Sequence, residues 1–179
     1  MTKRYAKKIA AVQGAATAEI QGLFRELEAR WRKSAMVVGV IEDCQEQAQR
    51  ACGGGELVEI PSGRRHVIYQ SLGRGSDACC LDPAGVVTAC ESIRRDIRPG
   101  CDLVVLSKFG KLEIGGSGLT SAFVAAIEIE VPILTSVAPM FQNEWDAFAA
   151  PYYELLPPDA GAIDNWWRSV ASHEFRLAG

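Results

Sequence analysis

The sequence predicts an α/β fold in three layers, with a mostly parallel sheet between helices. Short, mostly apolar runs recur at residues 9–12, 36–41, 103–106 and 131–137, and such runs are typical of parallel strands buried on both faces. Segments with apolar residues at helical spacing separate these runs. The chain opens as strand, loop, helix, strand, an order that indicates parallel pairing through right-handed crossovers.

The first helix is predicted from one apolar face, and Thr17 or Gly14 is expected to cap it. That face contains Ile20, Leu23, Phe24, Leu27 and Trp31. The strand at 36–41 then ends in Glu42-Asp43. This pair is interpreted as a base or metal ligand, or, because carboxylates are usually exposed, as a solvated strand end. A polar loop is expected over residues 45–55.

A β-hairpin insertion is predicted next, with strands at 56–60 and 66–71 around the turn residues 61–65. His66 lies within this hairpin and is expected to be structural. A helix then starts at Asp82-Pro83, with Asp as its cap and Pro in its first turn.

The rest of the chain continues the alternation. After the central strand at 103–106 we expect a helix at 119–130, a strand at 131–137, a helix at 141–148, a strand at 152–156 and a last helix capped by Asp159. Trp166 and Trp167 lie on the apolar face of that helix. They are explained equally well by packing on the sheet and by a homodimer surface.

Composition argues against some classes of function. The 179 residues are interpreted as one domain, 1–179, with a net charge of −3, which argues against binding to nucleic acid through phosphate contacts. No apolar run is long enough for a signal peptide or a membrane span, so we expect a cytoplasmic protein without a membrane partner. The six cysteines lack zinc or iron–sulfur spacing. They are expected to be reduced thiols, with no metal or cofactor.

The stretch after the central strand is the strongest functional signal. Lys108 and Lys111 follow the strand, and the glycine-rich turn 115–118 precedes a helix. Open α/β sheets bind ligands at the carboxyl ends of their strands, and backbone amides before a helix form anion sites. The alternative is that Lys111 and Glu113 form a solvated pair beside a flexible connection.

The residues Ser107-Lys108-Phe109-Gly110-Lys111-Leu112-Glu113 resemble a segment of the small nucleoside-triphosphatases first known from thermophiles. In those proteins an apolar strand is followed by Asp-Glu-Ile-Gly-Lys-Met-Glu. Gly110, Lys111 and Glu113 match that segment, whereas Ser107 and Lys108 replace its acidic pair.

The chain is more similar to an uncharacterised bacterial family that is often encoded beside molybdate-transport or other molybdenum genes and looks like degenerate P-loop NTPases. The shared motifs are the Lys-Phe-Gly-Lys-x-Glu stretch at 108–113 with its glycine-rich turn, the Gly…Ala-Cys-x-Leu-Asp-Pro segment at 75–83, and a strand leading to the Trp-x-x-Phe helix at 145–148. The resemblance implies a P-loop NTPase type of fold and a role in molybdenum or oxyanion metabolism.

The sequence lacks what P-loop hydrolysis requires. A working loop reads G-x-x-x-x-G-K-S/T, and an acidic residue at the end of the central strand holds magnesium. The matching segment, 13–19, has one glycine and no lysine; Thr17 offers a hydroxyl, but Glu19 adds negative charge. The sequence therefore predicts binding of an anion without hydrolysis.

The predicted ligand is a small oxyanion or a nucleotide, and Arg64, Arg65 and Arg74 are expected to add positive charge. Two alternatives stay open: a nucleoside triphosphatase with an atypical phosphate loop, and an oligomeric interaction module with a vestigial site. The candidate ligand-binding residues are Gln13, Gly14, Thr17, Lys108, Gly110, Lys111, Glu113, Gly115, Gly116, Ser117 and Gly118.

Overall fold

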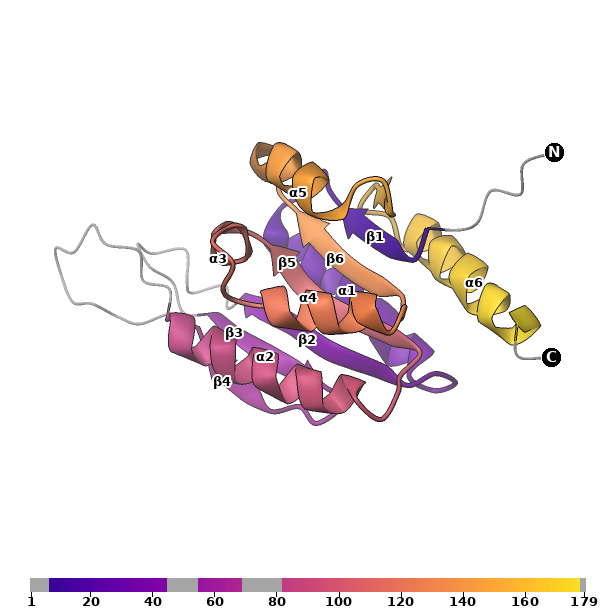
Figure 1. Cartoon of the computed structure of the whole chain (residues 1–179), viewed down its shortest axis with the longest axis horizontal. Helices are drawn as coiled ribbons and strands as arrows, with labels where there is room; N and C mark the ends of the chain where they lie inside the picture. The colour runs from indigo at the N-terminus through magenta and orange to yellow at the C-terminus, as the bar shows by residue number, and fades with distance from the viewer. Residues whose placement is uncertain (1–6, 45–54, 69–81, 178–179) are drawn as a thin grey trace, which may run out of the picture.

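A computed structural model describes residues 7–44, 55–68 and 82–177, with side chains up to residue 171. One seven-stranded sheet runs through these residues in the order β4-β3-β2-β5-β6-β1-β7, and helices cover both of its faces (Figure 1). This is the predicted three-layer α/β arrangement. The strands are β1 (Ile9–Val12), β2 (Val37–Cys44), β3 (Gly55–Ile60), β4 (Arg65–Val67), β5 (Leu103–Phe109), β6 (Ile133–Val137) and β7 (Tyr153–Leu156).

The predicted hairpin insertion is confirmed and extends the sheet beside β2. β3 pairs antiparallel with both β2 and β4, whereas the pairs β2–β5, β5–β6, β6–β1 and β1–β7 are parallel. Of the loop expected at 45–55, residues 45–54 lie outside the described residues, and Gly55 belongs to β3, where it pairs with Cys44. The expected strand residues 69–71 lie outside the described residues.

Inside the hairpin, His66 and Glu59 form a buried pair, with 2.6 Å between His66 Nε2 and Glu59 Oε1. Burial alone would raise the pKa of Glu59, but hydrogen bonds from His66, Ser62 and Ser92 outweigh it and hold the pKa below its ordinary value. This packing agrees with the structural role predicted for His66.

The helices divide into two layers. α2, α4 and α5 pack on one face of the sheet, and α1 and α6 pack on the other (Figure 1). Their bounds are α1 (Thr17–Trp31), α2 (Pro83–Ile97), α3 (Lys111–Ile114), α4 (Thr120–Glu128), the 3₁₀ turn η2 (Pro139–Phe141), α5 (Gln142–Ala149) and α6 (Ala160–Leu177). The short helix α3 was not predicted, because one turn is too short for a periodic signal.

Two of the three predicted helix caps are confirmed. The Asp82 carboxylate accepts a hydrogen bond from Ala84 N at 2.9 Å, and that of Asp159 accepts one from Ala162 N at 2.8 Å. The cap of α1 is Ala16 rather than Thr17 or Gly14, and no side chain bonds to that helix end. Thr17 is instead the first residue of the helix, so its hydroxyl is exposed near the end of β1.

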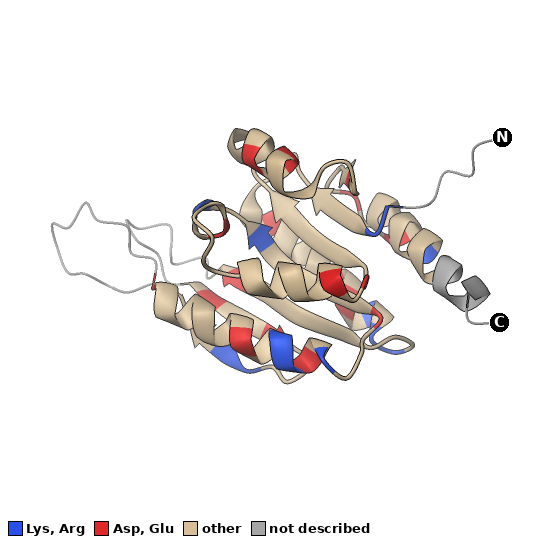
Figure 2. Cartoon of the chain, viewed as in Figure 1, with Lys and Arg blue, Asp and Glu red and all other residues tan. Residues whose placement is uncertain are grey.

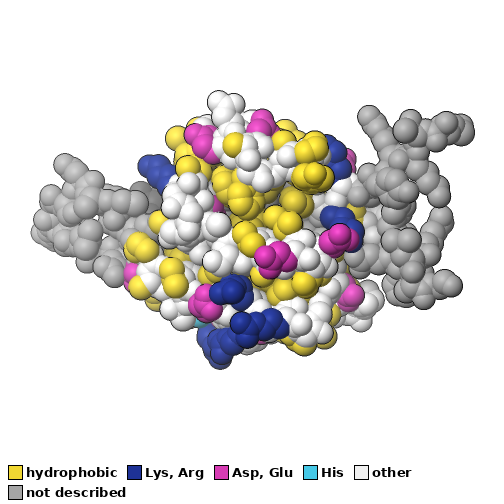
Figure 3. Space-filling view, in the orientation of Figure 1, with side chains coloured by type: hydrophobic (Ala, Val, Ile, Leu, Met, Phe, Trp, Pro, Cys, Tyr) yellow, Lys and Arg dark blue, Asp and Glu magenta, His cyan; other side chains and the backbone are white. Residues whose placement is uncertain are grey.

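Aromatic side chains fill the layer beneath α4 and α5. Phe109, Phe123, Trp145 and Phe148 stack edge to face or tilted, and the ring centroids of Phe109 and Trp145 lie 5.1 Å apart. Figure 3 shows hydrophobic side chains gathered between α5 and α4, over β6.

The opposite layer buries the two tryptophans of α6. Trp166 and Trp167 are only 3% and 8% exposed. Trp167 packs on Trp31 with 5.7 Å between ring centroids, and Trp166 Nε1 donates to Lys7 O at 2.9 Å. The homodimer interpretation of this pair is therefore wrong, since both rings belong to the core.

Within the described part of the chain, no helix is long and apolar enough to cross a bilayer. Cys90 is a buried free thiol and Cys44 is a half-buried free thiol, as expected. The described residues contain no cluster of three or more metal-ligating side chains. Cys52, Cys79 and Cys80 lie outside these residues.

Replacing Glu130 with glycine is expected to stabilise the protein by about 0.5 kcal/mol, because a left-handed backbone is costly for residues with a Cβ. Glu130 follows α4 with a φ of 59°. Its exposed ion pair with Lys8 spans 4.0 Å and contributes little. Urea denaturation measures the change. Glu128→Gly, at the exposed last position of α4, should instead lower stability. A loss of stability in Glu130→Gly would contradict the prediction.

Candidate functional site

Five of the predicted ligand-binding residues meet at one cavity of about 420 Å³. It lies at the carboxyl edge of the sheet, where the connections that follow β1, β5 and β6 come together. The five residues are Gly14, Thr17, Lys108, Gly110 and Lys111. Sequence positions almost 100 residues apart therefore form one site, because β6 lies between β1 and β5 in the sheet.

Gln13 precedes Gly14 in the chain but does not itself line the cavity. Its side-chain amide donates both hydrogens, one to Val137 O and one to Gln142 Oε1, each at 3.1 Å. The contacts fix the end of β1 to the connection between β6 and α5. Gln13 therefore has no amide hydrogen left for an anion, which argues against the predicted binding role.

The end of β5 carries the first cationic group. The strand continues through Ser107 and Lys108 to Phe109, with a register shift against β6. Lys108 Nζ lies 2.6 Å from Glu42 Oε2, and the side chains are 37% and 5% exposed, respectively. The expectation that Glu42 marks a solvated strand end is wrong. β2 and β5 are neighbours, and the buried Glu42 side chain lines a small pocket together with apolar residues such as Leu57 and Val86.

Buried hydrogen bonds hold the backbone around this pair. Gln21 Oε1 accepts from Glu42 N at 2.9 Å, and Gln21 Nε2 donates to Ser107 O at 2.7 Å. Ser136 Oγ donates to the same oxygen at 2.8 Å. α1 is thus tied to the ends of β2 and β5, and β5 to β6.

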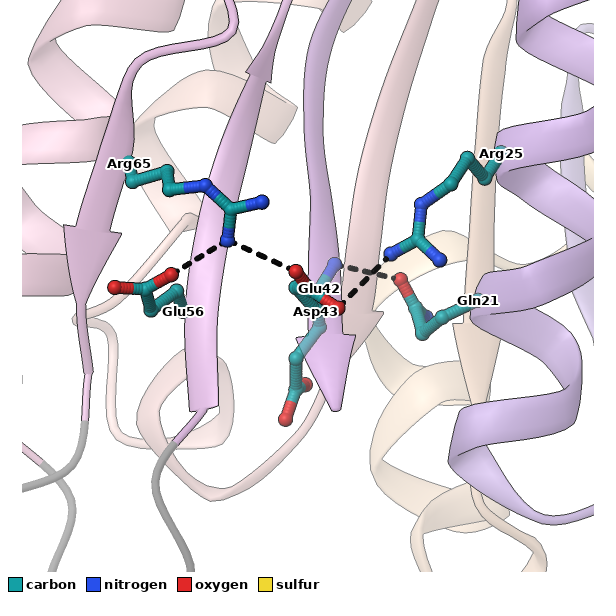
Figure 4. Close-up of polar contacts among 6 residues, drawn as sticks. All are labelled: Gln21, Arg25, Glu42, Asp43, Glu56 and Arg65. Atoms are coloured by element: carbon teal, nitrogen blue, oxygen red, sulfur yellow. Dashed lines mark hydrogen bonds and ion pairs between the residues drawn. The ribbon is translucent and has the colours of Figure 1, made fainter. Parts of the chain in front are cut away.

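Asp43 faces a different set of partners from its neighbour Glu42. Its carboxylate contacts Arg65 at 2.9 Å and Arg25 at 3.4 Å, and Arg65 also contacts Glu56 at 2.6 Å. Figure 4 shows the Glu42 carboxylate pointing away from these arginines. The carboxylates of Glu42 and Asp43 therefore contact different residues, although the two acids are adjacent in the chain.

Lys111 supplies the second cationic group of the cavity. It is the exposed first residue of α3, and Figure 2 shows basic and acidic residues side by side on this short helix. No ion pair joins Lys111 to another side chain within the described residues. The alternative of a solvated Lys111–Glu113 pair is therefore wrong.

Glu113 organises the turn that carries Lys111. Its buried carboxylate accepts from Gly110 N at 2.9 Å and from Leu119 N at 2.8 Å. Burial raises the pKa of Glu113, and the backbone hydrogen bonds only partly offset that effect. The predicted ligand-binding role is not supported, because both oxygens already bind the protein's own backbone.

The glycine-rich turn does not present the predicted row of free amides. Gly115 N donates to Lys111 O, Gly116 N to Glu113 O and Ser117 N to Leu112 O, at 2.9 to 3.2 Å. The turn closes on itself around Glu113, and Gly115, Gly116, Ser117 and Gly118 do not line the cavity. The predicted anion site at these amides is therefore wrong.

The arginines expected to add charge do not line this cavity either. Arg65 is held by Asp43 and Glu56. Arg64 follows the hairpin turn at the end of β3, which lies beside Gly39 rather than beside the carboxyl end of β2. Arg74 lies outside the described residues.

The sequence reasoning missed one wall of the cavity. Ser136 and the residues after β6 complete it, and the latter include Pro139, Met140 and Phe141. Ligands bind at the carboxyl ends of parallel strands, and β6 is a parallel strand like β5. The residues after β6 could therefore have been predicted in the same way.

A second cavity of about 390 Å³ lies at the opposite end of the sheet. Its lining includes Lys8, Ile9, Ile127 and Tyr152. None of the predicted ligand-binding residues reaches it.

Two known proteins are similar to this chain. It is 30% identical over 146 residues to the molybdenum import ATP-binding protein ModC 2 of Bradyrhizobium diazoefficiens, an alignment that covers 82% of this chain but 16% of that protein. The solution structure of a human cancer-related nucleoside triphosphatase superposes with a TM-score of 0.58 and 15% identity, over 94% of this chain and 95% of that one.

The superposition shows that the chain has a P-loop NTPase type of fold. The sequence similarity covers only a small part of the ModC 2 protein, so that protein's name describes much more than the matched region. A family model described as a protein of unknown function, DUF2478, matches residues 9–166. The chain belongs to the DUF2478 family.

Proposed function

We propose that this protein binds a nucleotide or a small oxyanion at the carboxyl edge of its sheet and does not hydrolyse it. The observation that carries the proposal is the cavity of about 420 Å³, whose only charged lining residues within the described chain are Lys108 and Lys111. A cavity with two ammonium groups and no carboxylate on its wall favours an anionic ligand.

The absence of hydrolysis is proposed from the residues at two positions. Phosphoryl transfer in P-loop enzymes uses a loop lysine on the phosphates and an acid that holds magnesium. The β1–α1 connection, residues 13–16, contains no lysine, and Ser107 and Lys108, near the end of β5, occupy the place where an acid would stand. Charge stabilisation accounts for most of the catalysis in such reactions.

A role in molybdenum metabolism is part of the proposal. It is supported by the similarity to a protein named for molybdenum import and ATP binding. Molybdate and tungstate are therefore tested beside nucleotides.

The test is a thermal-shift panel with ATP, GTP, phosphate, sulfate, molybdate and tungstate, each with and without magnesium. A ligand at 100 times its dissociation constant stabilises the fold by about 2.7 kcal/mol. Lys111→Ala should remove most of the shift. Lys33→Ala, a change at an exposed lysine outside the cavity lining, should retain it. No shift with any ligand would overturn the proposal.

The same samples test the two alternatives. Magnesium-dependent phosphate release that is lost in Lys111→Ala would favour a nucleoside triphosphatase. A melting temperature that depends on protein concentration, without any ligand shift, would favour an oligomeric module.

A further inference from the structure

The ion pair between Lys108 and Glu42 lies between two hollows. Lys108 lines the large cavity and also an adjoining pocket of about 60 Å³, whereas Glu42 lines the small pocket and not the large cavity. The small pocket has apolar walls that include Leu57, Val86 and Leu119. Charges attract more strongly in such surroundings than in water.

We propose that Glu42 is a built-in competitor for the anion site. Its carboxylate holds Lys108 at 2.6 Å, so an anion in the large cavity meets a cation whose charge is already offset. Full binding then requires Lys108 to exchange the carboxylate for the ligand. This inference rests on the proposed function and adds a regulatory contact to the same site.

In this exchange the side chain of Lys108 moves, whereas Glu42 stays in place. Glu42 is buried, and its backbone N–H is fixed by Gln21. Lys108 is more than one-third exposed and has a flexible four-carbon stem. Its ammonium group can turn toward the cavity that it already lines without a change in the backbone.

The test is Glu42→Gln, which keeps the shape of the side chain and removes its charge. Phosphate, and ATP without magnesium, are titrated calorimetrically into the wild-type protein and the variant. Affinity should rise about tenfold, equivalent to about 1.4 kcal/mol, because the anion then no longer competes with the carboxylate that lies 2.6 Å from Lys108 Nζ. A role for Glu42 in holding the site together predicts the opposite sign, since losing a support weakens binding.

Asp43→Asn is the matched control. It makes the same change in net charge one residue further along β2, but Asp43 contacts Arg25 and Arg65, on the other side from the Glu42 carboxylate (Figure 4). Its affinity should change less than about twofold, because neither Asp43 nor its two arginine partners line the cavity. The melting temperature of each variant verifies that it is folded.

The outcomes separate the two proposals. If the wild type binds and Glu42→Gln binds equally or more weakly, the competitor inference fails and the proposed function stands. An equal gain in Asp43→Asn would also overturn the inference, because net charge alone would then explain it. If neither the wild type nor Glu42→Gln binds any ligand of the thermal-shift panel, the proposed function itself fails.

Discussion

Gly39→Ala is expected to prevent stable folding. Gly39 lies in the middle of β2 with a φ of 131°, and an added Cβ would lie 1.9 Å from Val105 O on the neighbouring strand. No side-chain rearrangement relieves a clash with backbone, so β2 and β5 would have to separate. Changes of this kind cost more than about 4 kcal/mol, a large part of the roughly 5–15 kcal/mol that stabilises a domain.

Tryptophan fluorescence and urea denaturation measure this effect, because Trp31, Trp145, Trp166 and Trp167 are all buried. Gly22→Ala is the control. Gly22 lies in α1 with no atom near the added Cβ, and alanine there should stabilise the helix by up to about 1 kcal/mol. A Gly39→Ala protein with the wild-type urea midpoint would show that the two strands are not packed as described.

Glu113→Ala should have the second-largest effect and should abolish ligand binding as well. Removing the carboxylate leaves Gly110 N and Leu119 N without their acceptor in a buried place. Each unsatisfied group costs about 1–3 kcal/mol, so the two together give a loss of roughly 2–6 kcal/mol. The turn that positions Lys111 would also lose its support.

Two neighbouring glycine-turn positions provide the comparison. A Cβ on Gly118 would lie 2.2 Å from Glu113 Oε1, at a φ of 61°, so Gly118→Ala should resemble Glu113→Ala. Ser117→Ala, at an exposed position of the same turn, should retain stability and binding. Wild-type stability in both Glu113→Ala and Gly118→Ala would contradict the central place of this carboxylate.

Glu113 also predicts how the stability of the fold depends on pH. Burial raises the pKa of Glu113 in the folded protein. Its contribution to the free energy of unfolding is therefore fully present below the unfolded pKa of about 4.3, and it is lost as the pH rises through the folded pKa. Glu113→Gln does not titrate. In urea denaturation, the free energy of unfolding of this variant should fall further below that of the wild type at pH 4 than at pH 7.5. An equal difference at the two pH values would contradict the predicted sign.

Features that depend on nearby residues could be predicted from the sequence. The apolar runs gave the strands, the helical spacing gave the helices, and the side chains of Asp82 and Asp159 cap the helices they were expected to cap. The hairpin followed from turn residues between two β-prone segments. The sequence also predicted that the end of β5 lies at the edge of the sheet where ligands bind, because the carboxyl ends of parallel strands lie at the same edge.

The candidate site was only partly predictable, because the partner of a charged group depends on strand order. Nothing in the residues after β5 indicates that Glu42 lies beside Lys108, or that the glycine turn would close around Glu113. Carboxylates are usually exposed, so both acids were interpreted as solvent-facing groups or ligands. The fold instead buries both.

The sequence by itself determined the layered α/β fold, the edge at which charged residues gather and the two lysines that line the cavity there. Only the tertiary structure decided which groups those residues contact. A lysine and a glutamate on separate strands become an ion pair when the strands are neighbours, and a carboxylate becomes structural when backbone amides surround it. Both outcomes follow from burial, and burial is a property of the packed sheet and helices rather than of any one segment.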